Sequence, residues 1–256
     1  MITSGIDIGS TTSKCILLKD GIEIIGQSLA SGGIGTLGPE KAHTEALLAA
    51  GIPKADRQFA TGYGRRRWAE ADGEISELSA HALGCHFLFP PARTVVDIGG
   101  QDAKVICLDP QGRMSSFVMN DKCAAGTGRF LEVMAEVLKI DLSALGTLAG
   151  QSVSPAAISS TCTVFAESEV ISQLANGTAI PDIAAGICRS VAVRTAALVR
   201  RAGLRADIFM SGGVSRSPGV REALGEALGV PVKTDPLAQM AGALGAALHA
   251  YHTATQ

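Results

Sequence analysis

The sequence predicts an α/β protein built from two similar halves, and three observations support this fold class. Strand-like apolar runs alternate with segments whose apolar residues have helical spacing. An apolar run that ends in a glycine turn with an Asp occurs twice, at 6–10 and at 94–100. Each turn is followed by a second apolar run, at 15–18 in the first case and at 104–108 in the second. Hydrophobic residues make up 46% of the 256 positions, as in a well-packed chain. We therefore expect a strand–turn–strand hairpin at the start of each half and a cleft between the halves.

The remaining elements are predicted from apolar spacing and from residues that break helices. The expected helices are Gly38–Ala50, 76–87, Gly128–Leu138, 164–174, 183–201, Pro218–Leu228 and an Ala-rich helix at 237–251. A strand is expected at 207–210, and the Phe-Pro-Pro sequence at 89–91 interrupts the pattern before the second hairpin. We expect one domain at 1–91 together with 237–256 and a second domain at 92–236.

The charge and the cysteine content limit the classes of function. The formal net charge is −2, and Lys and Arg are scattered, which argues against binding of nucleic acid or of an anionic membrane. The first residues do not resemble a charged leader with an apolar run, and no apolar stretch is long enough to cross a bilayer. We therefore expect a cytoplasmic protein with reduced cysteines. Four of its six cysteines lie in apolar surroundings and are expected to be buried and inert: Cys15, Cys85, Cys107 and Cys188.

The first glycine turn has the residue types of a phosphate-binding loop. Its candidate residues are Asp7, Gly9, Ser10, Thr11, Thr12, Ser13 and Lys14. Glycine permits a tight turn, hydroxyl groups and backbone amides can face phosphate oxygens, a carboxylate can hold hydrated Mg²⁺, and Lys adds positive charge. This loop does not have the Walker pattern. Taken alone, it could equally well be a plain turn between two strands.

Two further glycine loops make a nucleotide site the better interpretation. The second loop offers Asp97, Gly99, Gly100, Gln101 and Asp102. It adds another carboxylate and an amide that could orient water. The third loop contains Gly212 and Gly213 after the strand expected at 207–210, and two glycines allow close approach of a flat nucleoside.

In this order the three loops resemble the phosphate-1, phosphate-2 and adenosine motifs of the superfamily that contains sugar kinases, acetate kinase, the heat-shock chaperone ATPase and actin. The resemblance spans nearly the whole chain and implies two actin-like, ribonuclease H-like subdomains with ATP or ADP between them. It implies that Asp7 and Asp97 lie near Mg²⁺, that Gly212 and Gly213 approach the adenosine, and that the hydroxyls of the first loop and Lys14 surround the phosphates. Gln101 is the preferred residue for positioning the attacking water, with Asp102 and Asp97 as open alternatives.

Two cysteines separate this chain from kinases and from actin. Cys123 and Cys162 each sit just before an expected helix, where partial positive charge and free amides would stabilise a thiolate or an anionic cluster. Two thiolates cannot complete a four-cysteine cluster, but two chains related by a twofold axis would supply four. Alternatively, either cysteine could be an ordinary residue at a helix start.

The segments around these cysteines, 122–130 and 159–170, resemble very closely those of the activator component of 2-hydroxyglutaryl-CoA dehydratase. The match continues through 60–65, the second loop and 236–239, which adds Gln239 to the nucleotide-binding candidates. The resemblance implies a homodimer with one shared 4Fe–4S cluster held by Cys123 and Cys162 of both chains. It also implies reduction by ferredoxin or flavodoxin and ATP-driven transfer of one electron to a 2-hydroxyacyl-CoA dehydratase.

Other functions stay open from the sequence. The ATP-hydrolysing subunits of benzoyl-CoA reductase are close relatives of the activator family, so another low-potential iron–sulfur enzyme could be the partner. A small-molecule kinase would share the nucleotide loops but has no use for the cysteines. A redox sensor or an assembly ATPase would use both features without electron transfer to a dehydratase.

Overall fold

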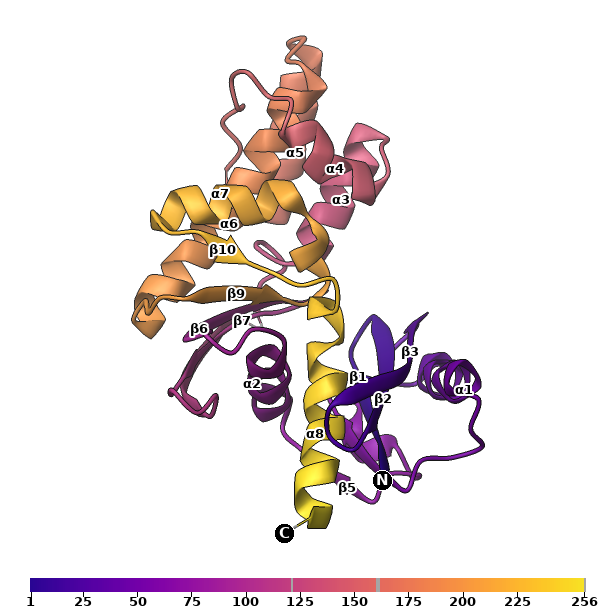
Figure 1. The fold of residues 1–256 in the computed structure, drawn as a ribbon. Helices are drawn as coiled ribbons and strands as arrows, with labels where there is room; N and C mark the ends of the chain where they lie inside the picture. Colours follow the sequence, from indigo (N-terminus) through magenta and orange to yellow (C-terminus); the bar gives the residue numbers. More distant parts are fainter. Residues whose placement is uncertain (121, 160–161, 256) are drawn as a thin grey trace. The chain divides into compact units, whose positions relative to one another are not determined.

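The computed structural model describes residues 1–120, 122–159 and 162–255. The chain divides into two compact units, each formed by segments that are distant in the sequence (Figure 1). Unit 1 comprises Met1–Pro91, Leu108–Met114 and Leu237–Gln256, and unit 2 comprises Ala92–Cys107 and Ser115–Pro236. No helix in the described ranges combines the length and apolarity that a membrane span requires.

Unit 1 contains a mixed five-stranded sheet with the strand order β3-β2-β1-β4-β5. Its elements are β1 (Ile2–Ile8), β2 (Thr12–Lys19), β3 (Glu23–Ser31), α1 (Gly38–Ala50), β4 (Arg57–Thr61), the 3₁₀ turn η1 (Arg65–Arg67), β5 (Gly73–Glu74), α2 (Glu77–Leu88), the 3₁₀ turn η3 (Ala238–Met240) and α8 (Ala241–Thr255). Strands β1, β2 and β3 are antiparallel neighbours, whereas β4 runs parallel to β1.

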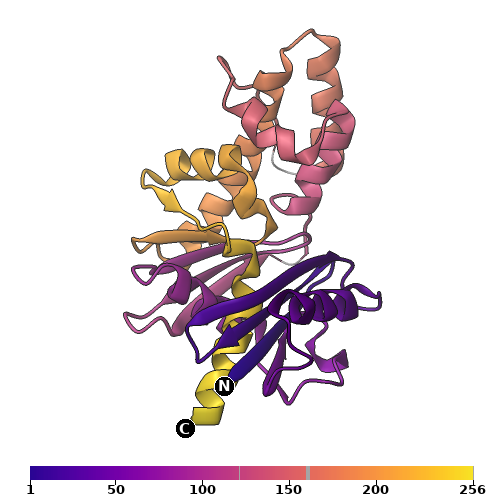
Figure 2. The same ribbon diagram turned by 45° about the vertical axis from the view of Figure 1, so that its right-hand side comes forward.

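Apolar side chains on alternate positions of β2 bury the two faces of this sheet. Cys15 and Leu17 pack against Ala42 and Ala46 of α1, whereas Ile16 packs on the opposite side in the cluster that includes residues of α8. Figure 2 shows α1 along the sheet from a second side. Helix α8 is rich in Ala and Gly because it lies very close to β1: a Cβ at Gly5 would stand only 2.0 Å from the carbonyl oxygen of Ala243.

Unit 2 repeats the same sheet order, β8-β7-β6-β9-β10, and adds a larger group of helices. Its elements are β6 (Thr94–Ile98), β7 (Ala103–Leu108), β8 (Met114–Asn120), α3 (Gly128–Leu138), α4 (Leu142–Ala149), α5 (Thr163–Ala175), α6 (Ile180–Ala202), β9 (Ile208–Ser211), the 3₁₀ turn η2 (Gly213–Arg216), α7 (Pro218–Leu228) and β10 (Val232–Lys233). One apolar core joins the sheet to these helices and includes Val96, Phe130, Ile187 and Met210.

The two halves are related strand by strand, which confirms the predicted fold class. The register pairs Asp7 with Lys14 across β1 and β2, and it pairs Asp97 with Lys104 across β6 and β7. Strands β4 and β9 occupy the same place in their sheets, parallel to β1 and to β6. A duplicated strand order and a duplicated register place equivalent residues at the same edge of each sheet.

One predicted helix needs correction, and several elements were not predicted at all. The helix expected at 237–251 begins only at Ala241, because Met240 donates its amide to the Leu237 carbonyl and so closes a tighter 3₁₀ turn over 238–240. Helix α4 and strands β4, β5 and β10 were not predicted, and neither were strands β3 and β8. Strands β3 and β8 lie at sheet edges. Strand β8 in particular, with its serines at 115 and 116, is largely exposed, so it lacks the continuous apolar run that marks a buried strand.

Candidate functional site

The phosphate-1 loop joins β1 to β2 in unit 1. A hydrogen bond of 3.1 Å from the Gly9 amide to the Thr12 carbonyl closes the turn. Ser10 and Thr11 are exposed at its tip, so their hydroxyls and amides can reach a ligand. Ser13 is buried and donates to the Gly32 carbonyl at 2.9 Å, which commits its hydroxyl to holding β3 against the loop. Ser13 therefore helps to shape the loop, unlike Ser10 and Thr11, whose hydroxyls are exposed.

Asp7 stands at the end of β1 in a cradle made by two glycines. Its carboxylate forms an ion pair of 3.3 Å with the Lys14 ammonium, and both side chains are largely buried. A Cβ at Gly62 would lie 2.4 Å from Asp7 Oδ1, and a Cβ at Gly242 would lie 2.9 Å from Oδ2. These contacts are shorter than van der Waals distances, so only glycine leaves the carboxylate in place. Because a carboxylate is a preferred Mg²⁺ ligand, this cradle suits the predicted role of Asp7.

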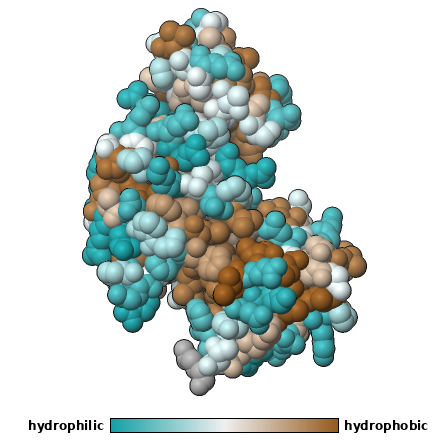
Figure 3. Space-filling model, in the orientation of Figure 1, coloured by the Kyte–Doolittle hydropathy of each residue, from teal (hydrophilic) through white to brown (hydrophobic). Residues whose placement is uncertain are grey.

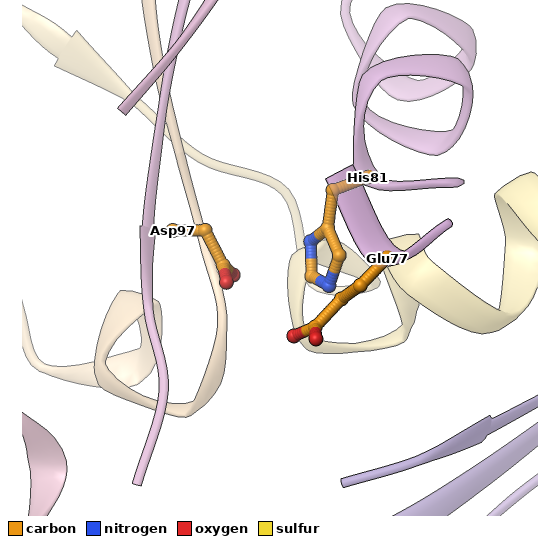
Figure 4. A group of neighbouring side chains, drawn as sticks. All are labelled: Glu77, His81 and Asp97. Carbon is orange, nitrogen blue, oxygen red and sulfur yellow. The ribbon is translucent and has the colours of Figure 1, made fainter. Parts of the chain in front are cut away.

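His81 of α2 is a further residue beside Asp7, and the sequence did not single it out. The same hypothetical Cβ at Gly242 would lie 2.9 Å from His81 Nε2, so the imidazole and the Asp7 carboxylate both border this one glycine. Figure 4 shows His81 and Glu77 one helical turn apart on α2, and it also shows Asp97 on β6. A carboxylate oxygen of Glu77 and a ring nitrogen of His81 lie within 4.8 Å of each other. Their spacing of four residues was the only sequence signal for this pair.

Replacing Gly242 by Ala is expected to disturb the Asp7 cradle. The added methyl group would press on both Asp7 and His81, and overpacking of this kind costs about 1–3 kcal/mol of unfolding free energy. We expect Gly242→Ala to raise the dissociation constant of Mg–ATP at least about tenfold, since that change corresponds to about 1.4 kcal/mol. Calorimetric titration with Mg–ATP measures the binding, and thermal unfolding measures the stability. Unchanged binding in a folded variant would contradict the role given to this cradle.

The phosphate-2 loop joins β6 to β7 in unit 2 and is built in the same way. The Gly99 amide donates to the Asp102 carbonyl at 2.9 Å. Asp97 is buried, accepts a hydrogen bond of 2.9 Å from the Ser211 hydroxyl and pairs with Lys104 at 3.4 Å. Asp102 pairs with the same ammonium at 2.8 Å. Gln101 is exposed at the tip of the loop.

The third motif follows β9. Gly212 has a φ of 79°, a conformation that favours glycine, and a Cβ there would stand 2.4 Å from the Ile98 carbonyl oxygen. This glycine therefore lets β9 end directly against β6. Gly213 is exposed and begins η2, and Gln239 is half-buried in η3 of unit 1.

The two predicted cluster cysteines differ in their relation to helices. Cys162 lies at the start of a helix, as predicted: it is the N-cap of α5 and has an extended backbone. Cys123 precedes α3 by a turn, because Thr127 is the N-cap of that helix, so the expectation that it stands at the helix start is wrong. Ser160 and Thr161, from the second cysteine segment, and Asp121, from the first, lie outside the described residues.

The positive charge near Cys123 comes from a side chain. Arg194 of α6 points its Nη1 atom at the Cys123 sulfur at 4.0 Å. The backbone turn brings Gly126, with a φ of 87°, against the stem of the same arginine. The guanidinium therefore places a positive charge beside any anionic group held at this sulfur. Arg194 is 71 residues away in the sequence, and no motif pointed to it.

The first amides of α3 are bonded to the phosphate-2 loop. Gly128 donates to the Gly99 carbonyl and Arg129 to the Gly100 carbonyl, each at 2.8 Å. Gly128 is also tight against the loop, since a Cβ there would stand 3.0 Å from the Gly99 oxygen. The segment that carries Cys123 and the loop that carries Asp97 and Asp102 therefore share hydrogen bonds inside unit 2.

The other four cysteines are buried, as predicted. Burial raises the pKa of the Cys15 thiol to about 11, although a hydrogen bond with Ser4 acts in the opposite direction. Burial likewise raises the pKa of Cys188 to about 12, partly offset by Ser217. Such thiols stay protonated near neutral pH and are poor metal ligands. Cys123 and Cys162 are the two cysteines with partial solvent access.

Nearly the whole chain is similar to known proteins. Residues 4–250 match the model of the BadF/BadG/BcrA/BcrD ATPase family. The (R)-2-hydroxyglutaryl-CoA dehydratase activating ATPase of Acidaminococcus fermentans is 56% identical, with 99% of this chain and 98% of the relative aligned. The activator of lactoyl-CoA dehydratase of Anaerotignum propionicum is 51% identical, with 99% of both chains aligned.

The same similarity holds in three dimensions. The solved structure of the activator of 2-hydroxyisocaproyl-CoA dehydratase from Clostridium difficile, with bound ADPNP, has a TM-score of 0.97 and 48% identity and covers 100% of this chain and 96% of that chain. This protein belongs to the BadF/BadG/BcrA/BcrD ATPase family. The predicted resemblance to dehydratase activators is thereby confirmed.

Proposed function

We propose that this protein is the ATP-hydrolysing activator of a 2-hydroxyacyl-CoA dehydratase and works as a homodimer around one 4Fe–4S cluster. The observation that carries the proposal is the combination, in one family member, of two Asp–Lys glycine loops with two accessible cysteines. Its relatives at 51% and 56% identity act with dehydratases for different acyl groups, so we propose the class of substrate and leave the acyl group open.

The described residues fit a cluster held at Cys123 and Cys162. Of six cysteines, these two combine partial exposure with either a helix N-terminus or a neighbouring guanidinium. A bound 4Fe–4S cluster would supply a one-electron carrier of low potential. The chain itself would supply thiolate ligands, the positive end of the α5 dipole and the Arg194 charge. One chain offers two ligands, so a second copy would complete the set of four.

The surface of α5 supports the second copy. Val164 and Phe165, which follow Cys162, are 66% and 64% exposed, and Ile171, nearly two helical turns after Val164, is 53% exposed. Figure 3 shows apolar residues, in brown, among polar ones at the end of unit 2 where Figure 1 labels α3, α4 and α5. Large apolar side chains in this number are uncommon on a surface that faces only water. We propose that they pack against the partner α5 beside the shared cluster.

The glycine loops would bind Mg–ATP. Asp7 and Asp97 would hold the hydrated metal ion, and the first loop with Lys14 would bind the phosphates. Gly212, Gly213 and Gln239 would contact the adenosine. For the attacking water, Asp102 has a fixed position on Lys104 whereas Gln101 is exposed, so geometry favours Asp102 over the residue preferred from the sequence.

A small-molecule kinase is the second candidate function, since the nucleotide loops alone do not exclude it. The accessible cysteines with a guanidinium beside one of them argue against it, because a kinase makes no use of them. Electron transfer separates the two functions. Reduced protein with Mg–ATP should activate a purified 2-hydroxyacyl-CoA dehydratase, and omission of ATP should abolish activation. Activation without nucleotide, or ATP turnover that requires a small-molecule acceptor, would contradict the proposal.

Iron content tests the shared site. Anaerobically isolated protein is expected to be brown and to contain about four irons per dimer, because the two ligands of each chain combine on one cluster. Iron analysis together with the mass of the particle in solution measures this ratio. Four irons on each monomer would contradict the shared cluster, and an iron-free dimer would contradict the cluster itself.

A further inference from the structure

The Asp–Lys pair occurs once in each unit, and the two copies differ in their remaining partners. In unit 1 the turn bond runs from Gly9 to Thr12, and in unit 2 the equivalent bond runs from Gly99 to Asp102. The register therefore makes Asp102 the counterpart of Thr12. The residue two positions before the lysine therefore carries a hydroxyl in unit 1 (Thr12) and a carboxylate in unit 2 (Asp102).

Unit 1 leaves donors available for a ligand. Among the described residues, the Lys14 ammonium has one acidic partner, Asp7. Thr61 at the end of β4 is in register with Asp7, and its buried hydroxyl has no hydrogen-bond partner within the described chain. A buried hydroxyl without a partner costs about 1–3 kcal/mol, which an incoming acceptor would recover.

In unit 2 the equivalent hydroxyl and ammonium groups have partners within the chain. Ser211, the counterpart of Thr61, donates its hydroxyl to Asp97. The Lys104 side chain is 3% exposed, and its ammonium bonds both Asp97 at 3.4 Å and Asp102 at 2.8 Å. Two of the three N–H donors of this buried ammonium are thus directed at carboxylates, whereas Lys14 has a single carboxylate partner among the described residues. Asp102 itself keeps 29% of its side chain exposed and can therefore face a ligand.

We propose that Lys104 is a positioning residue that fixes the Asp102 carboxylate for the attacking water, whereas its counterpart Lys14 binds phosphate. In this assignment the Asp–Lys pair of unit 1 binds phosphate, and the pair of unit 2 positions the carboxylate that acts on water. This assignment rests on the proposed ATPase function and names a residue of the reaction that no motif indicated. Fixing a carboxylate in advance lowers the activation barrier because the group does not have to be ordered during the reaction.

Steady-state ATP hydrolysis and Mg–ATP binding should separate the two lysines. We expect Lys104→Met to lower kcat at least about tenfold and to change the dissociation constant of Mg–ATP less than about threefold. Lys14→Met should instead raise the dissociation constant at least about tenfold. Lys233→Met, an exposed lysine on β10, is the matched control and should leave both quantities unchanged. Weakened binding with kcat intact in Lys104→Met would overturn the assignment.

A double-mutant cycle makes the test specific. If Lys104 acts through Asp102, then Asp102→Asn lowers kcat to a similar degree, and the double variant loses no more than the larger single loss. Losses that multiply would show independent action and overturn the proposal. Because Asp102 is partly exposed, Asp102→Asn should fold even if Lys104→Met does not, and kcat within about twofold of the unmodified chain in that variant would overturn it as well. A failure of the proposed ATPase function can be told apart from a failure of the Lys104 assignment, because in the first case the unmodified chain would show no ATP turnover.

Discussion

Protein that carries Cys123→Ser or Cys162→Ser is expected to be isolated without the cluster and without electron transfer. Each chain contributes two of the four thiolates in the proposed site, so one substitution removes two ligands from every dimer. A serine hydroxyl stays protonated at neutral pH and does not replace a thiolate. Loss of the brown colour and of the iron, measured on protein purified without oxygen, is the predicted result. ATP binding should persist in Cys162→Ser, because no backbone hydrogen bond links Cys162 to a glycine loop among the described residues.

Two buried cysteines provide matched controls for this prediction. Cys85→Ser and Cys188→Ser introduce the same change of atom where no cluster is proposed. A buried hydroxyl at either position costs about 1–3 kcal/mol of unfolding free energy, but iron and colour should stay. Loss of iron in the buried variants at the same level as in Cys123→Ser would show that the effect comes from unfolding. Retention of full iron in either Cys123→Ser or Cys162→Ser would contradict the proposed ligand set.

Nucleotide and cluster are expected to be coupled, and the bonds from α3 to the phosphate-2 loop are the proposed connection. Gly99 and Gly100 accept hydrogen bonds from the start of α3, and the Cys123 turn leads directly into that helix. A change in the loop when the γ-phosphate is lost would therefore shift the cysteine segment. An iron chelator should remove the cluster at rates that differ at least about fivefold between ADP and a non-hydrolysable ATP analogue. If ATP and ADP also shift the equilibrium between the oxidised and the reduced cluster, oxidation must change the relative affinity for the two nucleotides by the same factor.

Gly128→Ala tests this connection directly. Its methyl group would stand 3.0 Å from the Gly99 oxygen and would press the helix away from the loop. We expect the two chelation rates to become similar in this variant while iron content is retained. Gly150→Ala at the end of α4, where a Cβ meets only an ordinary contact of 3.5 Å, should keep the difference. Equal chelation rates in the unmodified protein, saturated with each nucleotide, would mean that the two sites do not communicate.

Much of the fold and the general type of site could be predicted from the sequence. Both hairpins and most helices follow from local patterns: Ser76 caps α2 through its side chain, and apolar spacing defines α3 from Gly128 to Leu138. The glycine turns, their carboxylates and the distinction between two accessible and four buried cysteines were also predictable. Each depends on residues that are near in the chain or on the burial that an apolar neighbourhood implies.

The sequence by itself therefore determined the duplicated α/β fold, the glycine loops and the family. All three depend on short motifs and on the spacing of apolar residues along the chain. Only the tertiary structure decided which side chains support those motifs. Lys104 meets Asp102, Arg194 meets the Cys123 sulfur, and His81 borders the same glycine as Asp7. These residues are isolated polar positions on strands or helices, and a single polar residue has the same local pattern whether it faces water or a buried carboxylate. The difference arises from contacts between distant segments, which the spacing of residues along one chain does not encode.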